Sequence, residues 1–385
     1  MGAYLAVKEM WRNRGRFLLF SLVIALITTL VLFIAGLAEG LGSGNKEYLE
    51  KLNAELVVYK DNVDLSIPTS KIERSKLNAL RRVEGVADVG PISFSSASLV
   101  FTDGRKPLNV SLIGVEPGKP GESPVMTGRG LERRRGMEAV IDRNVAIRAK
   151  VGVGDVITVK SIQGADEELY DLTVVGVSDG RQYSLQPSVT VPSLTFEKIK
   201  PQAVPGGSDT AELVSNVAAV RLQNPADLET VATRLENQVK DIQVADRETA
   251  FSNTPGYSAQ QSTLNTQRIF VLLIGILVIG GFFQIQTLQK VPQIGMLKAI
   301  GTPNRAIGVA SLTQISAVTA IGVAIGATVT LLLSLAFPPT VPIVFTSAAV
   351  TTALVSLLLI GPIGGLVSIR YALRIEPLTA LGLGA

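Results

Sequence analysis

The chain has 385 residues, of which 47% are hydrophobic and 18% charged, and it carries a formal net charge of +4. It contains no histidine and no cysteine, which excludes Ser-His-Asp and Cys-His nucleophiles, zinc sites built from these residues, and disulfide bonds. Residues 40–267 hold 26 basic and 29 acidic residues, and the other 10 basic and 3 acidic residues flank apolar segments. Because the basic excess lies outside any soluble surface, it does not indicate nucleic-acid binding.

The first 40 residues predict an interfacial helix followed by a membrane span. Residues 1–16 can turn Leu5 and Trp11 toward lipid and Lys8 toward phosphate, so we expect an amphipathic cytoplasmic elbow helix there. Residues 17–40 predict transmembrane helix 1, because about 20 apolar residues span a hydrocarbon core of roughly 30 Å. This apolar run exceeds the roughly 7–15 residues of a signal-peptide core, so we expect it to remain uncleaved.

Residues 41–267 predict an extracytoplasmic mixed α/β domain with helical stalks. Residues 40–55 continue the first span as a helix, residues 200–210 form a loop rich in Pro and Gly, and residues 252–262 form a polar link to the next span. No catalytic signature is found. The expected strands are 55–60, 98–101, 109–115, 139–141, 156–160, 172–177 and 217–222, and the expected helices are 71–83, 143–150 and 227–240.

Three further uncharged stretches predict transmembrane helices 2, 3 and 4 over 268–289, 306–336 and 341–369. Basic residues precede the first span, occur in the loop 290–305 and follow the last span in the tail 370–385. The positive-inside rule therefore puts both termini and this loop on the cytoplasmic side of the cell membrane. The predicted fold class is an α-helical membrane protein with four transmembrane helices plus a mixed α/β extracytoplasmic domain.

The loop 290–305 is short, basic and interrupted by glycine and proline. Its middle predicts under two turns of helix, with Ile294, Leu297 and Ile300 on one side. A small amphipathic helix suits docking into a groove on a partner protein. The alternative is an inert turn that lies on the lipid headgroups.

Four segments share a pattern with a known family: 5–14 (LAVKEMWRNR), 138–159 (EAVIDRNVAIRAKVGVGDVITV), 293–301 (QIGMLKAIG) and 374–381 (RIEPLTAL). In this order they resemble the FtsX/MacB-type permeases of ABC transporters, and together they extend over the whole chain. The resemblance implies a MacB/FtsX-like permease that has no fused ATPase domain and is not itself catalytic.

The resemblance also implies partners for this chain. Such permeases work in the lipid bilayer as homodimers with two copies of a cytoplasmic ABC ATPase subunit, and no nucleic acid is involved. The loop that contains Ile294, Leu297, Lys298 and Ile300 would be the coupling helix that docks on the ATPase.

Residues 33–42 (FIAGLAEGLG) resemble the haem-efflux (HrtB-type) and DevC-like branch. This implies export of haem or a similar hydrophobic toxic compound, with haem as substrate and no intrinsic cofactor or metal. With no His or Cys available, Glu39 is the candidate haem ligand, and two copies could face each other in a homodimer; a Tyr or the Met126 thioether are other donors. Alternatives are export of peptides, lipids or lipoproteins, a non-transporting FtsX-like mechanotransmitter, and, for Glu39, a residue that only marks the end of a span.

Overall fold

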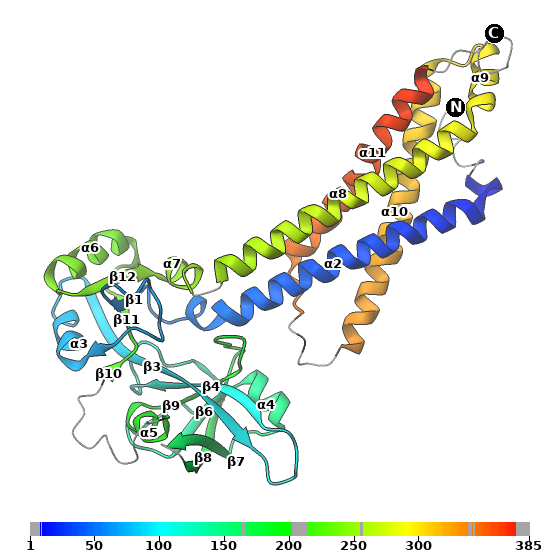
Figure 1. Cartoon of the computed structure of the whole chain (residues 1–385). Coiled ribbons are helices and arrows are strands. Elements are labelled where there is room, and N and C mark those ends of the chain that lie inside the picture. The colour runs from blue at the N-terminus through cyan, green and yellow to red at the C-terminus, as the bar shows by residue number, and fades with distance from the viewer. Residues whose placement is uncertain are drawn as a thin grey trace. The chain divides into compact units, whose positions relative to one another are not determined.

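The computed structural model describes residues 8, 10–163, 166–201, 214–254, 257–337, 341 and 343–374 (Figure 1). The chain divides into two compact units, one made of Met1–Gly40 with Gln261–Ala385 and the other of Leu41–Gln260. Residues 1–7 and 9 of the expected elbow helix, the loop at 202–210 and the tail from 375 lie outside the described residues.

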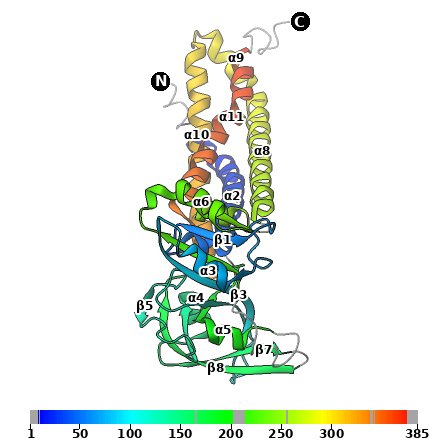
Figure 2. The ribbon, with the colours of Figure 1, turned by 90° about the vertical axis from the view of Figure 1, so that its left-hand side faces the viewer.

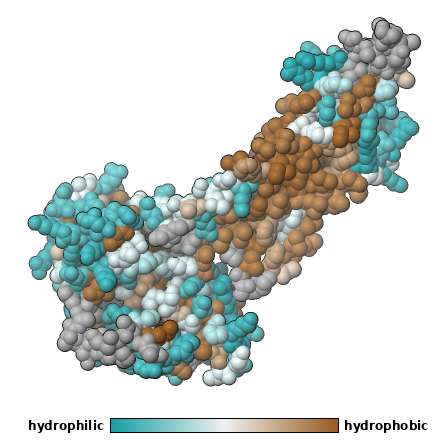
Figure 3. Space-filling model, in the orientation of Figure 1, coloured by the Kyte–Doolittle hydropathy of each residue, from teal (hydrophilic) through white to brown (hydrophobic). Residues whose placement is uncertain are grey.

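Within the described residues, four helices are long and apolar enough to cross a membrane, as expected: α2 (Arg14–Glu50), α8 (Tyr257–Gln289), α10 (Asn304–Ala336) and α11 (Ser347–Arg374). The short helix α9 (Val291–Ala299) follows α8. Figure 3 shows a broad apolar surface over the long helices.

Several helix boundaries differ from the expectation. The fourth helix begins at Ser347 instead of 341, because Thr346 Oγ1 accepts a hydrogen bond from Ala349 N at 3.3 Å and so acts as the N-cap. The polar link at 252–262 is helical over much of its length, because α7 (Arg247–Ser252) ends at its first residue and α8 begins at Tyr257. Residues 257–262 form the first turns of α8.

Small residues let the four long helices approach closely. A Cβ added at Gly322 of α10 would lie 2.6 Å from Ile24 Cβ of α2, and one at Gly280 of α8 would lie 2.7 Å from the carbonyl oxygen of Gly364 in α11. Hydroxyl groups add contacts, since Thr29 Oγ1 of α2 donates to Gly326 O of α10 at 3.2 Å. This is the packing mode expected where lipid removes the hydrophobic driving force between helices.

The second unit contains a ferredoxin-like lobe with β-α-β-β-α-β order. Its four antiparallel strands are arranged as β12-β1-β11-β3. Buried Leu80 and Leu235 of the two helices pack with Leu56 and Val220 in one hydrophobic cluster. The elements are β1 (Leu56–Lys60), α3 (Arg74–Leu80), β3 (Val86–Val100), β11 (Val217–Leu222), α6 (Leu228–Gln238) and β12 (Ile242–Asp246).

A second lobe is inserted between β3 and β11 and forms a closed ring of strands. The far end of β3 pairs with both β4 and β7, and the ring continues through β9, β6 and β8 back to β7. Closure leaves these strands without free edges, and buried Leu112, Ile141 and Leu172 fill the interior. The added elements are β4 (Leu108–Val115), β6 (Glu138–Asp142), α4 (Arg143–Ala149), β7 (Val156–Gln163), β8 (Asp166–Ser178), β9 (Ser188–Pro192) and α5 (Ser193–Ile199).

In Figure 2, α3 and β1 lie in the first lobe, and α5, β7 and β8 lie in the second. The described part of the unit also contains three short strands: β2 (Ile72–Glu73) pairs with β10 (Val214–Ser215), and β5 (Val125–Gly128) pairs with β8. The predicted helix 71–83 is therefore partly wrong, because β2 precedes a helix that ends at Leu80.

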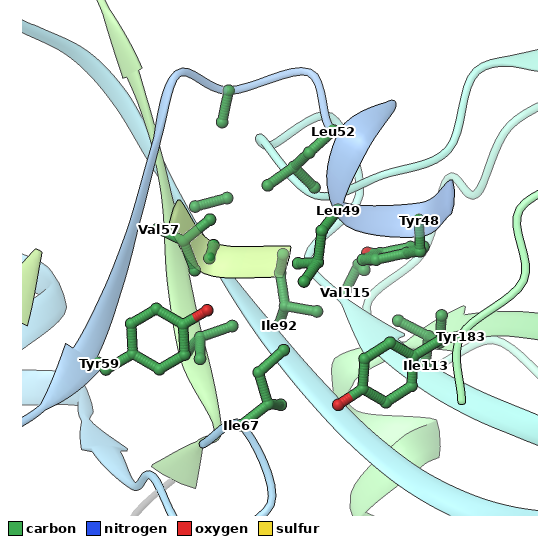
Figure 4. Packing of buried hydrophobic residues seen from close by; sticks show 14 of the residues in the cluster. Tyr48, Leu49, Leu52, Val57, Tyr59, Ile67, Ile92, Ile113, Val115 and Tyr183 are labelled. Carbon is green, nitrogen blue, oxygen red and sulfur yellow. The ribbon is translucent and has the colours of Figure 1, made fainter. Parts of the chain in front are cut away.

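The end of α2 is built into the core of this unit. Tyr48, Leu49 and Leu52 are at most 2% exposed and pack near Ile92 and Ile113 (Figure 4). The Tyr48 hydroxyl donates to Gly121 O at 2.8 Å. The helical stalk expected after the first span is thus a structural part of the α/β domain.

Candidate functional site

The first candidate site lies near the outer end of the apolar run of α2, at Glu39. This residue follows Leu32 by seven positions and Thr28 by eleven, so it lies on the same face of α2 as these two buried residues. That face packs against α10, where a Cβ at Gly326 would meet Thr28 Cβ at 2.6 Å. The exposed stripe of α2 is a different face, formed by Leu18, Leu22, Leu26 and Leu30.

The Glu39 side chain is half-buried, and among the described residues no hydrogen bond or ion pair to its carboxylate is found. One turn earlier, a Cβ added at Gly36 would lie 2.7 Å from Phe345 Cε1, and the Gly36 carbonyl accepts a hydrogen bond from Val344 N at 3.0 Å. The extended residues between α10 and α11 therefore lie directly against α2 at this point.

Aromatic side chains gather around the same part of α2. The rings of Phe33 and Phe337 are 5.7 Å apart between centroids, and Phe345 is 38% exposed. An unpaired carboxylate beside exposed aromatic rings can bind a flat apolar molecule that carries a cation or a metal. Among the described residues no group of three or more Asp or Glu could hold a metal ion by itself.

The second candidate site is α9, which is longer than the predicted two turns. Ile294 is only 8% exposed and forms a small cluster with Ile307 of α10 and Ala372 of α11. Lys298 Nζ donates to Leu373 O at 2.9 Å, and Leu297 is half-buried. The expectation that Ile294, Leu297 and Ile300 share one exposed face is therefore wrong for Ile294, which holds α9 against its own protomer.

The outward face of α9 and of the residue after it consists mainly of residues outside this set. Pro292, Met296, Ala299 and Ile300 are exposed and follow a helical spacing, with Met296 59% and Ile300 76% exposed. Sequence reasoning found Ile300 but missed Met296. Pro292 could have indicated where this helix begins, because proline is favoured in the first turn of a helix. The helix does begin at Val291, earlier than predicted, and this start includes Met296 in its outward face.

Comparison with known proteins gives two family matches. Residues 17–238 match the model of the MacB-like periplasmic core domain, and residues 268–377 match that of the FtsX-like permease C-terminal region. Together they extend over both structural units.

Curated relatives align along almost the whole chain. A protein of Staphylococcus haemolyticus described as "Putative hemin transport system permease protein HrtB" is 28% identical over 388 residues, covering 98% of this chain and 99% of its own. A protein of Staphylococcus epidermidis with the same description is 28% identical over 381 residues, covering 99% of each. An uncharacterized ABC transporter permease of Mycobacterium tuberculosis is 20% identical over 389 residues, covering 98% of this chain and 99% of its own.

Two solved structures were also found. The extracellular domain of the noncanonic ABC-type transporter YknZ from Gram-positive bacteria matches with a TM-score of 0.35 and 13% identity, covering 50% of this chain and 100% of that one. The periplasmic region of MacB from Actinobacillus actinomycetemcomitans matches with a TM-score of 0.35 and 17% identity, covering 55% and 92%.

Proposed function

The chain belongs to the FtsX/MacB-type permeases of ABC transporters, and from that premise we propose that it exports haem or a similar hydrophobic toxic compound from the membrane. Permeases of this family are non-catalytic, so ATP is hydrolysed by a partner ATPase. It is a multi-pass membrane protein with an extracytoplasmic domain.

The substrate assignment is supported chiefly by the chemistry around Glu39. Ferric haem offers a hard metal that accepts a carboxylate ligand, and its macrocycle can lie against aromatic rings. The half-buried Glu39 without an ion pair and the exposed ring of Phe345 supply both groups on one side of α2. Relatives described as hemin transport permeases, at 28% identity over the full length, point the same way.

Two copies of the chain would form the working unit, each with one ATPase subunit. The leucine stripe of α2 (Leu18, Leu22, Leu26 and Leu30) is exposed in the single chain and gives a second copy an apolar surface to pack against. The positive-inside pattern predicts that α9 lies in the cytoplasm, where the exposed Met296 and Ile300 would dock on the ATPase.

The proposal is tested by titrating haem into the purified full-length permease in lipid nanodiscs and recording the Soret band. We expect saturable binding by the wild type and loss or a shift of the band in Glu39→Ala. Glu39→Gln keeps the shape but removes the anionic ligand, so it should behave like Glu39→Ala. Glu50→Gln at the last residue of the same helix, where the side chain is 51% exposed, is the matched control.

Each other result has a defined meaning. A wild-type spectrum in both Glu39 variants would show that Glu39 does not bind haem and only marks the end of a membrane span. A wild-type protein that binds no haem would contradict the substrate assignment and leave export of peptides, lipids or lipoproteins, or mechanotransmission, as the function of this permease.

A further inference from the structure

A cavity of about 280 Å³ lies between the two lobes of the α/β domain. The ferredoxin-like lobe contributes Arg74 and Arg81 of α3, and the second lobe contributes Glu116 after β4 and Arg134 before β6. A molecule held here would contact both lobes at once.

The arginines in this cavity outnumber the carboxylates that neutralise them. Glu116, with a side chain 13% exposed, is paired with both Arg81, at 3.5 Å, and Arg134. For Arg74 no hydrogen bond or ion pair is found within the described part of the chain. The other lining carboxylate, Glu197, is paired with Lys200. The three guanidinium groups therefore share the single carboxylate of Glu116. Three positive charges and one negative charge leave this group with a formal charge of about +2.

Other contacts hold the Arg81 side chain and the backbone before Arg134 in place. Arg81 donates from Nε and Nη2 to Val89 O at 3.3 and 2.9 Å. The backbone before Arg134 is fixed by the buried carboxylate of Glu138, which accepts hydrogen bonds from Glu132 N and Arg133 N at 3.0 and 3.2 Å. Fixed guanidinium groups lose less entropy when they bind an anion than free ones do.

We propose that this cavity, lined by Arg74, Arg81 and Arg134, is a binding site for a phosphate-bearing ligand with a small apolar part. Guanidinium groups bind phosphate oxygens through paired hydrogen bonds, and a phosphate monoester carries nearly two charges at neutral pH. Leu77, Leu194 and Val214 offer apolar walls. The volume falls below the roughly 300–1,000 Å³ of drug-sized sites, so the cavity fits a headgroup-sized molecule and not a haem macrocycle. The proposal does not depend on the exported compound.

The test is calorimetric titration of phenyl phosphate into the full-length permease in phosphatidylcholine nanodiscs, at pH 8 and constant ionic strength. Arg74→Gln and Arg134→Gln should each weaken binding about tenfold, as expected for loss of a charge-assisted hydrogen bond. Arg135→Gln, an exposed neighbour outside the cavity, should bind like the wild type. Glu116→Gln should bind more tightly, because it frees two guanidinium groups from their competitor.

Nanodiscs that contain phosphatidic acid separate the two sources of such a ligand. If the lipid competes with phenyl phosphate in the wild type but not in Arg74→Gln, a lipid headgroup occupies the site; without competition the ligand is a soluble phosphate ester. Any of three results would overturn the proposal. The first is no saturable binding of phenyl phosphate, and the second is equal binding by the Arg74, Arg134 and Arg135 variants. The third is displacement of phenyl phosphate by succinate but not by inorganic phosphate.

Discussion

Glu39 is the only charged residue between Phe17 and Gly40, and this, together with the absence of His and Cys and the resemblance of residues 33–42, singled it out as a candidate. A charge in an apolar segment is costly and so marks a functional site by default. The sequence could not show which residues lie around Glu39. The contact of Gly36 with Phe345 joins residues more than 300 positions apart, and no local pattern encodes such a contact.

Glu138 is a second carboxylate whose role depends on its contacts. Burial by itself would raise its pKa, but hydrogen bonds from the backbone N–H groups of Glu132 and Arg133 and from the Arg129 guanidinium, at 2.7 Å, outweigh burial and lower it. A carboxylate with a lowered folded-state pKa adds stability above its unfolded value, here 4.5, and loses it as pH falls further.

We therefore expect the α/β domain of the wild type to lose stability as pH falls below about 4.5, the ordinary value for this group. Glu138→Gln should be less stable at pH 7, and the difference from the wild type should shrink at low pH. Thermal unfolding followed by circular dichroism between pH 3 and 7 measures this. Glu132→Gln, whose side chain is 65% exposed, is the control, and a pH dependence in Glu138→Gln identical to that of the wild type would contradict the assignment.

At the scale of elements, the long apolar helices were the most predictable part of the chain, because their length and lack of charge are decisive. Strands and short helices of the α/β domain were harder. β4, β6, β7 and β11 were anticipated from β-branched runs, whereas β9 (Ser188–Pro192) and β12 (Ile242–Asp246) were not. These two strands gain their stability from neighbours distant in sequence. The ring likewise closes through long-range pairs, such as β4 with β9 and β3 with β7, in addition to the local hairpins β3–β4 and β7–β8.

Adjacent glycines in α8 give a matched test of helix packing. Gly280→Ala would bring a Cβ 2.7 Å from Gly364 O of α11, whereas Gly281→Ala meets nothing within 4 Å. We expect the first change to destabilise the helical unit by about 1–3 kcal/mol through overpacking and the second to be neutral or slightly stabilising. Thermal unfolding in detergent measures both, and equal stability of the two variants would contradict the α8–α11 contact.

The face of α9 that points outward could not be chosen from its periodicity, because both sides carry apolar residues. The structure buries Ile294 and exposes Met296 and Ile300. We expect Met296→Asp to lower permease-dependent ATPase activity at least about tenfold, the effect of losing a central interface residue.

The same variant should still reach the membrane and fold, because Met296 is 59% exposed. Asn304→Asp, an exposed residue at the start of α10, adds the same charge nearby and serves as the control. Full ATPase stimulation in Met296→Asp would show that α9 does not couple the two subunits through this face.

At the scale of the whole molecule, the order of apolar and hydrophilic segments was enough to predict the architecture of the chain. Four spans, a domain inserted after the first span and basic flanks were readable directly, and the family assignment followed from ordered motifs. The orientation in the membrane remains a prediction and is testable by cysteine labelling, because the chain has no native cysteine.

A cysteine in place of Ser75, which is exposed on α3, should react with an impermeant maleimide in intact cells. One in place of Asn304, which is exposed after α9, should react only after the cells are opened. The reverse pattern would place the α/β domain in the cytoplasm and contradict the predicted topology.

The central claim is that this permease exports haem or a similar compound by coupling it to a partner ATPase, and ATP hydrolysis by the reconstituted complex in nanodiscs tests it most directly. With the wild type, we predict a saturable rise in the hydrolysis rate as haem is added, and no rise with Glu39→Ala, although the basal rate of that complex should be preserved. A rate that does not respond to haem in the wild type, or that responds equally in Glu39→Ala, would contradict the account.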